Sequence, residues 1–296
     1  MKIVLISPPN HFEDSPPLPS LALGTLSAIL DKNQISHVCI DGNFLPSFKA
    51  FRKGRKKSTD ILKEINIIAA DYQPDIIGIS LWGVSIPFAF IISASLKIIL
   101  PGTKIIAGGI SDKYTAEYIL QYAEIIDYVY TGEAETVIPE LFFAIQKNSK
   151  NTHFTGLCKQ GMEMAMNEKL CYSENPDMEA CYHHFLYKDM HAVFMEASRG
   201  CVHQCIFCGL HRVPYRRKSP GEVVQQMKKL KDLYDVGFIN FADNFFPMQG
   251  SWISEFLDIL KKAPLKINWA CLIRADRIDR DLIPELKNAG CTGIFM

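Results

Sequence analysis

The chain has 296 residues, of which 48% are hydrophobic and 22% charged, a balance typical of a folded protein with room for about two domains. The 32 basic side chains equal the 32 acidic ones, so no overall charge favours nucleic acid or an anionic membrane. No apolar run reaches the roughly 18 residues that a membrane-spanning helix needs, and the apolar stretch after Met1 lacks the cleavage site of a signal peptide. We expect a cytoplasmic protein with neither a nucleic-acid nor a membrane partner.

The first part of the chain alternates short β-rich runs with longer helical ones. This alternation predicts an α/β domain with a doubly wound, Rossmann-like parallel sheet, which we assign to residues 1–147. The predicted strands are Lys2–Ser7, His37–Asp41, Ile76–Ser80, Lys104–Ala107 and Asp127–Thr131. The predicted helices are Leu18–Asp31, Ile61–Ala70, Phe88–Ile99, Tyr114–Ala123 and Thr136–Gln146.

A ligand crevice is predicted at the carboxyl ends of these strands, where open parallel sheets bind their ligands. The strand ends carry Pro8-Pro9, Asp41-Gly42, Ser80-Leu81, Gly108-Gly109 and Gly132-Glu133. The sequence contains no GxGxxG or GxxxxGK[ST] loop here, which disfavours a dinucleotide or a nucleoside triphosphate. Glycine pairs let a large ligand approach the backbone closely, although ordinary strand-to-helix turns also use them.

A linker with a hairpin around Lys159–Met162 is predicted for residues 148–189, and a second α/β region follows at 190–296. Its predicted strands are Ala192–Ala197, Phe238–Ala242, Lys266–Leu272 and Thr292–Phe295. A helix should begin after Ser219, since Pro220 and Glu222 complete a capping box, and bury Val223, Met227, Leu230 and Tyr234. At roughly 30 residues per strand-helix unit, this region holds only three to four units of a barrel. We therefore expect a truncated chain with an open sheet edge that promotes self-association.

The nine cysteines are an odd number, unlike the even framework of a secreted disulfide scaffold. Cys201, Cys205 and Cys208 stand close together after the first strand of the second region. Three thiolates suit an iron–sulfur cluster in which one iron keeps an open position. A zinc site would need a fourth ligand such as His203 or His211. Three buried structural cysteines are the remaining alternative.

This segment resembles the signature of the radical S-adenosylmethionine (radical SAM) superfamily, CxxxCxxC with an aromatic residue, here Phe207, before the last cysteine. The resemblance implies that Cys201, Cys205 and Cys208 hold a 4Fe-4S cluster whose fourth iron binds S-adenosylmethionine. It also implies reductive cleavage of this cofactor to methionine and a 5'-deoxyadenosyl radical, with an electron donor such as flavodoxin or ferredoxin. Phe207 would lie on the S-adenosylmethionine side of the cluster.

Two downstream segments are similar to the same family. Asp243 stands where the family's second strand ends, and the resemblance implies that it accepts the ammonium group of S-adenosylmethionine. Its alternative role is a cap at a strand end. Arg274 ends a segment similar to the third strand and would meet the methionine carboxylate, unless it is paired with Asp276 or Asp243 instead.

The region ahead of the cysteines resembles the cobalamin-binding domain of cobalamin-dependent radical SAM proteins. The likeness rests on Ser7-Pro8-Pro9 followed by Pro16-Pro17-Leu18, on Gly78–Leu81, and on Ala107–Gly109 with Gly132–Glu135. It implies cobalamin contacts from Ser80, Leu81, Gly108, Gly109, Gly132 and Glu133. The DxHxxG motif that supplies a cobalt ligand in many cobalamin proteins is absent, and His11 stands alone in its place. A lone loop histidine is usually solvated, so the lower face of the corrin should be unligated or have a distant axial group.

Together these resemblances imply a methyltransferase that acts on an unactivated carbon of a small molecule or natural product. One S-adenosylmethionine would supply the methyl group through cobalamin, and a second would supply the radical that removes hydrogen from the substrate. A cyclisation or another rearrangement with the same cofactors is the second possibility. A truncated, non-catalytic corrinoid and iron–sulfur binding protein is the third. The sequence assigns no side chain to catalysis beyond the cofactor contacts.

Overall fold

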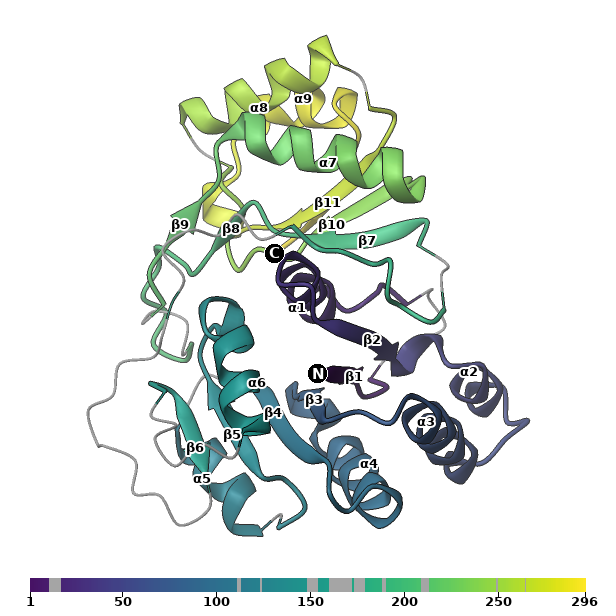
Figure 1. The fold of residues 1–296 in the computed structure, drawn as a ribbon. Helices are drawn as coiled ribbons and strands as arrows, with labels where there is room; N and C mark the ends of the chain where they lie inside the picture. Colours follow the sequence, from purple (N-terminus) through teal and green to yellow (C-terminus); the bar gives the residue numbers. More distant parts are fainter. Residues whose placement is uncertain are drawn as a thin grey trace. The chain divides into compact units, whose positions relative to one another are not determined.

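The computed structural model describes residues 1–10, 17–110, 113–122, 124–147, 154–159, 172, 179–187, 190–208, 213–248, 250–263 and 265–296. His11, His211 and most of the predicted hairpin lie outside these residues. The chain divides into two compact units, shown in Figure 1. The first comprises Met1–Ser173 and Ala180–Lys188, and the second comprises Glu174–Glu179 and Asp189–Met296.

The first unit contains a six-stranded sheet in the order β2-β1-β3-β4-β5-β6. Its parallel strands are β1 (Lys2–Ser7), β2 (Ser36–Asp41), β3 (Ile76–Ser80), β4 (Lys104–Ile110) and β5 (Tyr128–Thr131). A further strand, β6 (Leu157–Lys159), pairs antiparallel with β5 and falls within the predicted linker. Chain order reverses between β1 and β3, and such a switch point is where sheets of this kind bind ligands.

Helices cover both faces of this sheet: α1 (Leu21–Lys32), α2 (Pro46–Arg52), α3 (Ser58–Tyr72), α4 (Ile86–Ile99), α5 (Lys113–Tyr122) and α6 (Ile138–Gln146). Successive side chains of a strand point to opposite faces. Val4 and Ile6 therefore share a buried cluster with α3 and α4, whereas Leu5 lies on the side of Phe142 of α6. In Figure 1, α1 and α6 lie on one side of the strands, and α3 and α4 on the other. The doubly wound fold predicted from the sequence is confirmed.

Local signals explain where these helices begin. The first helix starts three residues later than predicted because the Ser20 Oγ accepts a hydrogen bond from the Leu23 N–H at 3.3 Å and so forms the cap. The short α2, which the sequence analysis missed, has Pro46 at its first position and an apolar side chain, Phe48, that is fully buried.

The second unit has a four-stranded parallel sheet in the order β12-β11-β10-β7. Its strands are β7 (Ala192–Met195), β10 (Phe238–Phe241), β11 (Asn268–Leu272) and β12 (Cys291–Phe295). The helices α7 (Pro220–Tyr234), α8 (Ser251–Lys262) and α9 (Ile283–Asn288) lie on one side of this sheet in Figure 1. This arrangement of parallel strands with helices outside them agrees with the predicted partial barrel.

The predicted start of α7 is present in full. The Ser219 Oγ accepts from the Glu222 N–H at 3.3 Å, while the Glu222 carboxylate accepts from the Ser219 N–H at 2.7 Å. Of the predicted buried stripe, Val223, Met227 and Leu230 are buried, and Tyr234, in the last turn, is half-buried.

An aromatic core joins the sheet of the second unit to α8. It comprises Phe241, Phe246, Trp252, Phe256 and Trp269, whose side chains are all buried. Ring centroids lie 4.7 Å apart for Phe241 and Phe246 and 5.6 Å apart for Phe246 and Trp252, separations at which aromatic pairs contribute about 0.5–1.5 kcal/mol beyond their area burial. Because Phe241 and Phe246 flank the carboxyl end of β10, this core fixes the edge on which the candidate site is built.

In the part of the chain that the structure describes, no helix combines the length and the apolar character needed to cross a membrane.

Candidate functional site

The segment that carries Cys201, Cys205 and Cys208, which we call the cysteine loop, connects the two strands of a ribbon that follows β7. In this ribbon β8 (Ser198–Arg199) pairs antiparallel with β9 (Arg216–Arg217), so the ribbon closes the base of the loop between them. Gly200 follows β8 with φ at +78°, and a Cβ there would lie 2.3 Å from the Pro214 carbonyl oxygen. Glycine is therefore required at this position, both for its backbone conformation and for the close approach of the two chain segments.

Cys201, Cys205 and Cys208 are half-buried on this loop, and the eight cysteines within the described residues form no disulfide. The Cys208 N–H donates to the Cys205 carbonyl oxygen at 3.0 Å, which folds the second and third cysteines into one turn. Ile206 and Phe207, between them, are 101% and 89% exposed. The loop thus presents thiols together with two uncovered apolar side chains, as expected of a segment that packs against a ligand.

A guanidinium group from another strand end reaches this loop. Arg274 follows β11, and its Nη1 lies 3.5 Å from the Cys205 Sγ. Its Nε lies 2.9 Å from the Asp276 Oδ1, so Asp276 is the ion-pair partner that the structure shows. A cation at this position offsets the negative charge of a thiolate or of a cluster bound through it.

Asp243, at the carboxyl end of β10, is 3% exposed. Its carboxylate accepts hydrogen bonds from the Ser198 Oγ at 2.5 Å and from the Ala197 N–H at 3.1 Å. Burial outweighs these bonds and raises its pKa to about 7. The described contacts correspond to the capping alternative, in which Asp243 ties the end of β7, just ahead of the cysteines, to β10.

Three glycines, Gly108, Gly109 and Gly132, lie at the carboxyl ends of β4 and β5, which we call the glycine-lined edge of the first unit. Gly109 is required by the backbone conformation, whereas the space beside Gly108 is open. Gly109 has φ at +92°, and a Cβ there would lie 2.6 Å from the Leu81 carbonyl oxygen. A Cβ on the neighbouring Gly108 would meet, among the described residues, only the Tyr130 carbonyl oxygen at 3.9 Å. Gly132, at the end of β5, also has a positive φ of +101°. The ends of β4 and β5 therefore expose backbone that a flat ligand can approach.

The loop after β3 borders this edge. Ser80 is half-buried, and Leu81 is 2% exposed and belongs to the core, with its N–H donating to the Gly108 carbonyl oxygen at 2.7 Å. The next side chain, Trp82, is 68% exposed. Trp82 was not among the site residues predicted from the sequence, although a tryptophan two residues after a strand end and next to Gly83 is a signal that could have identified it.

Comparisons with known proteins match both halves of this arrangement. The B12 binding domain family model matches residues 17–142, and the radical SAM superfamily model matches residues 195–296. The chain belongs to the cobalamin-binding radical SAM family. The cofactors of this family are cobalamin, S-adenosylmethionine and a 4Fe-4S cluster.

The curated relatives of this radical SAM chain include a methyltransferase and cyclases. It is 23% identical to an uncharacterised methyltransferase of Pyrococcus horikoshii, over 78% of this chain and 53% of the relative. It is 25% identical to an anaerobic magnesium-protoporphyrin IX monomethyl ester cyclase of Rubrivivax gelatinosus, over 85% of this chain and 51% of the relative. The corresponding cyclase of Cereibacter sphaeroides is 24% identical, over 76% of this chain and 40% of the relative. The chain thus spans about half the length of the curated relatives it matches.

The residues of both domains fit the family's cofactors. Three cysteines on one loop, without disulfides and beside a guanidinium, have the donor set of a cluster with one open iron. The open space at Gly108 has the form of an edge on which a macrocycle can lie against the backbone. Cys201, Cys205 and Cys208 are therefore the residues that would hold the cluster, and the glycine-lined edge is the part of the first unit that would hold cobalamin.

His203, which the sequence analysis considered only as a zinc ligand, lies inside the cysteine loop. Its ring packs edge-on against Phe245, with centroids 4.7 Å apart, and its buried Nε2 has no hydrogen-bond partner among the described residues. Desolvation, followed by the positive charges of Arg274 and Arg277, lowers its pKa, so the imidazole is neutral at pH 7. A neutral, unpartnered ring nitrogen here is available to a ligand of this site.

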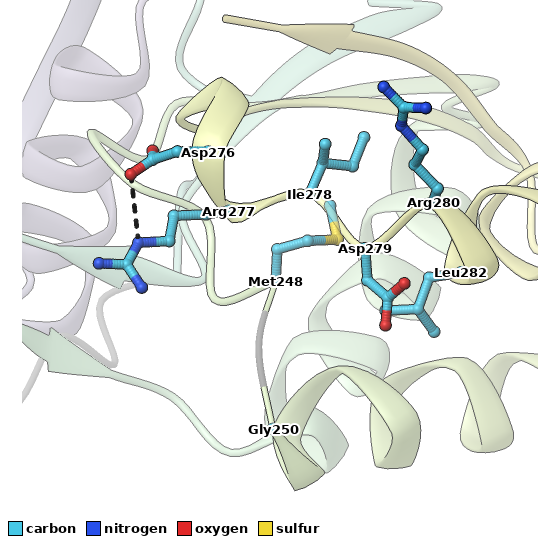
Figure 2. Close-up of a pocket in the computed structure, with 8 residues that line it drawn as sticks. All are labelled: Met248, Gly250, Asp276, Arg277, Ile278, Asp279, Arg280 and Leu282. Carbon is cyan, nitrogen blue, oxygen red and sulfur yellow. Dashed lines mark ion pairs between the residues drawn. The ribbon is translucent and has the colours of Figure 1, made fainter.

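A pocket of about 510 Å³ opens among the loops that follow β10 and β11 in the radical SAM domain. Figure 2 shows its lining, which is Met248, Gly250, Asp276, Arg277, Ile278, Asp279, Arg280 and Leu282. Asp276 pairs with Arg277 across 3.7 Å and also with Arg274, which reaches Cys205. The pocket is thus connected to the cysteine loop through one shared carboxylate.

Proposed function

We propose that this chain is the cofactor-binding part of a cobalamin-dependent radical SAM methyltransferase that acts on an unactivated carbon of a small molecule or natural product. The observation that carries the proposal is the presence in one chain of two carboxyl-terminal sheet edges, one with a cysteine loop and one with exposed glycine backbone. When bound, the cluster and S-adenosylmethionine supply a carbon-centred radical, and the corrinoid supplies a methyl group. The name of the Pyrococcus horikoshii relative supports this choice of reaction.

The residues of the radical SAM domain have distinct roles in this proposal. The three cysteines would hold the cluster. Arg274, whose Nη1 lies 3.5 Å from the Cys205 Sγ, would compensate the charge of the cluster, while Asp276 fixes the guanidinium. The exposed Phe207 covers S-adenosylmethionine and keeps water away from it. Asp243 acts as a positioning residue, because its two carboxylate oxygens accept hydrogen bonds from Ala197 and Ser198, which connect β7 to the cysteine loop.

The pocket beside Asp276 suits the polar part of S-adenosylmethionine. This cofactor carries an ammonium and a carboxylate on one carbon, and the pocket offers both signs of charge, with Asp276 and Asp279 beside Arg277 and Arg280. Opposite charges arranged in one cleft recognise such a zwitterion without a net charge in the site. Arg274 links this pocket to the cluster loop.

Within the first unit, we assign residues 1–147 as the corrinoid domain. Backbone and aromatic surface of this domain would hold cobalamin. Gly108, Gly109 and Gly132 let the macrocycle approach the ends of β4 and β5. Trp82 would lie against its face or rim, since its indole, two residues after Ser80, is 68% exposed. Glu133 stands at the end of β5 and would contact the amide side chains of the corrin.

The two products left by S-adenosylmethionine separate the candidate functions. Methyl donation leaves S-adenosylhomocysteine, whereas reductive cleavage leaves 5'-deoxyadenosine and methionine. Anaerobically reconstituted protein, given cobalamin, a low-potential reductant and S-adenosylmethionine, should form both nucleosides, and Cys205→Ala should abolish 5'-deoxyadenosine alone. Formation of 5'-deoxyadenosine without S-adenosylhomocysteine would favour the second candidate, a cyclisation like that named for the Rubrivivax gelatinosus relative. Formation of neither nucleoside would indicate a binding protein.

A further inference from the structure

A group of metal-binding side chains lies at the amino-terminal edge of the first sheet, opposite the glycine-lined edge. Asp31 lies in the last turn of α1, His37 is the second residue of β2, and His184 comes from the segment 180–187. One ligand atom from each of the three lies within 4.8 Å of the other two. The His184 Nε2 is 2.7 Å from the Asp31 Oδ1, and the two imidazole rings lie with centroids 4.1 Å apart.

Both ring nitrogens of His37 have hydrogen-bond partners, and a metal at Nε2 would displace the Ser27 hydroxyl from it. The His37 Nδ1 lies 2.8 Å from the Ile35 carbonyl oxygen, which can only accept, so Nδ1 carries the proton and Nε2 carries a lone pair. A backbone carbonyl on the far nitrogen is the usual outer-shell partner of a metal-bound histidine. Desolvation lowers the pKa of His37 and so keeps the ring neutral. Ser27, 2.7 Å from Nε2, also bonds the Cys39 thiol and keeps that partner if a metal takes the nitrogen.

A thiol stands next to the same carboxylate. The Cys181 Sγ is 3.2 Å from the Asp31 Oδ2. The segment that carries Cys181 and His184 is held by backbone hydrogen bonds at both residues, from the Cys181 N–H to the Gly24 carbonyl oxygen and from the Cys39 N–H to the His184 carbonyl oxygen, each 2.9 Å long. The four side chains are thus brought together by backbone contacts that do not depend on a metal.

We propose that Asp31, His37, His184 and Cys181 bind a divalent transition metal of the zinc class. Imidazole, carboxylate and thiolate are the ligands that zinc takes in four-coordinate sites. Zinc bonds of about 2.0–2.3 Å place ligand atoms roughly 3.3–3.8 Å apart. The ligand atoms of Asp31, His37 and His184, which lie within 4.8 Å of one another, must therefore draw closer, and the Cys181 Sγ, which contacts Asp31 but lies outside this group, must move towards it. The side chains of Asp31 and His184 are 40% and 37% exposed and can make this movement. The metal would replace the proton that these two side chains share, and it would fasten segment 180–187 to α1 and β2.

Zinc titration of the full chain tests this site. The cysteine loop could also take zinc, so the background is the chain with Cys201, Cys205 and Cys208 all replaced by serine. We expect this background to bind one zinc ion per chain and to melt at a higher temperature with the metal. His184→Ala and Asp31→Ala should each weaken binding at least tenfold. His183→Ala is the matched control, because it removes an exposed histidine from the same segment, and it should bind like the background.

Cobalt(II) in place of zinc reports the ligands directly. The background should show the intense visible bands of a tetrahedral site and a thiolate-to-cobalt charge-transfer band, and Cys181→Ser should lose the latter. Persistence of that band in Cys181→Ser would overturn the assignment of Cys181. Absence of stoichiometric zinc from the background, or equal binding by His184→Ala and His183→Ala, would overturn the site and leave Asp31 and His184 as a simple ion pair.

Discussion

The two units place their candidate sites at the same topological position, the carboxyl ends of parallel strands, but they build them from different parts of the chain. In the first unit the candidate site is formed by backbone atoms, with Gly108, Gly109 and Gly132 at the ends of β4 and β5. In the second unit it is formed by side chains on a loop that follows the β8–β9 ribbon. A large planar ligand needs shape and close approach, whereas a metal cluster needs particular donor atoms, and the two edges differ accordingly.

Each edge also contains one buried aspartate that ties loops to the sheet. Asp41 ends β2 and accepts from the Ser20 N–H at 2.7 Å and the Asn43 N–H at 3.1 Å, and burial raises its pKa to about 6. Asp243, at the end of β10, likewise accepts hydrogen bonds, and its donors, Ala197 and Ser198, precede the cysteine loop. In both units a buried aspartate that would not touch the ligand therefore ties a loop to the sheet.

The largest effect should follow loss of a cluster ligand. Anaerobically reconstituted wild type should bind about four irons, and Cys205→Ala should lose the cluster and with it all reductive cleavage of S-adenosylmethionine. Cys271→Ala is the matched control, since this buried strand cysteine packs as a small apolar group. Iron and sulfide analysis with 5'-deoxyadenosine assay checks both variants. Retention of a full cluster in Cys205→Ala, with its loss in Cys271→Ala, would refute the assignment.

Filling the open space at the glycine-lined edge should come next. Gly108→Leu places a side chain where, among the described residues, only the Tyr130 carbonyl oxygen lies within 4 Å, so the fold should tolerate it while the corrinoid is excluded. We expect corrinoid affinity to fall by at least about tenfold, or about 1.4 kcal/mol. Gly102→Leu is the matched control, because Gly102 precedes the amino end of β4 and its Cβ position is equally open among the described residues. Equal corrinoid affinity in the two folded variants would show that cobalamin does not bind at this edge.

Helices and strands whose determining residues lie close together in the sequence were predicted, whereas strands that depend on a distant partner were missed. Ser219 and Glu222 set the start of α7 within four residues of each other, and the five parallel strands of the first unit follow from short apolar runs, so both were predicted. The β8–β9 ribbon was missed because each strand has only two residues and depends on its partner across the cysteine loop. The short β6 was missed for a similar reason, since β5 supplies the pairing that makes it a strand.

The site shows the same division. The three cysteines carry their chemistry in their spacing, and the sequence identified them as a group. A capping role for Asp243 was one of the predicted alternatives, but its partners, Ala197 and Ser198, lie 46 and 45 positions away and could not be identified from spacing. The group around Asp31 could not be predicted from the sequence, since Asp31 and Cys181 are 150 positions apart.

A smaller effect is expected where the backbone, and not a ligand side chain, shapes the cysteine loop. Gly200→Ala forces a Cβ to within 2.3 Å of the Pro214 carbonyl oxygen at a φ of +78°, and such strain costs about 1–3 kcal/mol. We expect lower stability of the second unit and a reduced, though not abolished, iron content. Gly221→Ala, on α7 with no described atom within 4 Å of its Cβ position, should leave iron content unchanged and stabilise by about 0.4–1 kcal/mol. Full iron content and wild-type stability in Gly200→Ala would contradict the role of the ribbon.

A further effect should be a change in how the stability of the second unit depends on pH. The pKa of Asp243 is raised from an ordinary 3.8 to about 7, so between these values the folded state holds a proton that the unfolded state releases. Its contribution to the free energy of unfolding is therefore fully present below about pH 4 and is lost as pH rises towards 7, with a slope of at most about 1.4 kcal/mol per pH unit. Asp243→Asn should remove this slope. Its amide can accept from the Ala197 N–H and donate to the Ser198 Oγ, whose hydroxyl then donates to the Phe245 carbonyl oxygen, 3.1 Å away.

Tryptophan fluorescence can follow this unit alone. Two of the three tryptophans, Trp252 and Trp269, are buried in its aromatic core, and Trp82→Phe removes the signal of the first unit. Denaturant unfolding of Trp82→Phe, with and without Asp243→Asn, at pH values from 5 to 8 gives the difference that belongs to Asp243, since other titrating groups contribute equally to both proteins. Parallel curves for the two proteins would show that this carboxyl group titrates near its ordinary pKa. Its hydrogen bonds to Ala197 and Ser198 would then be those of a charged group, and the tie between β10 and the cysteine loop would hold unchanged across this pH range.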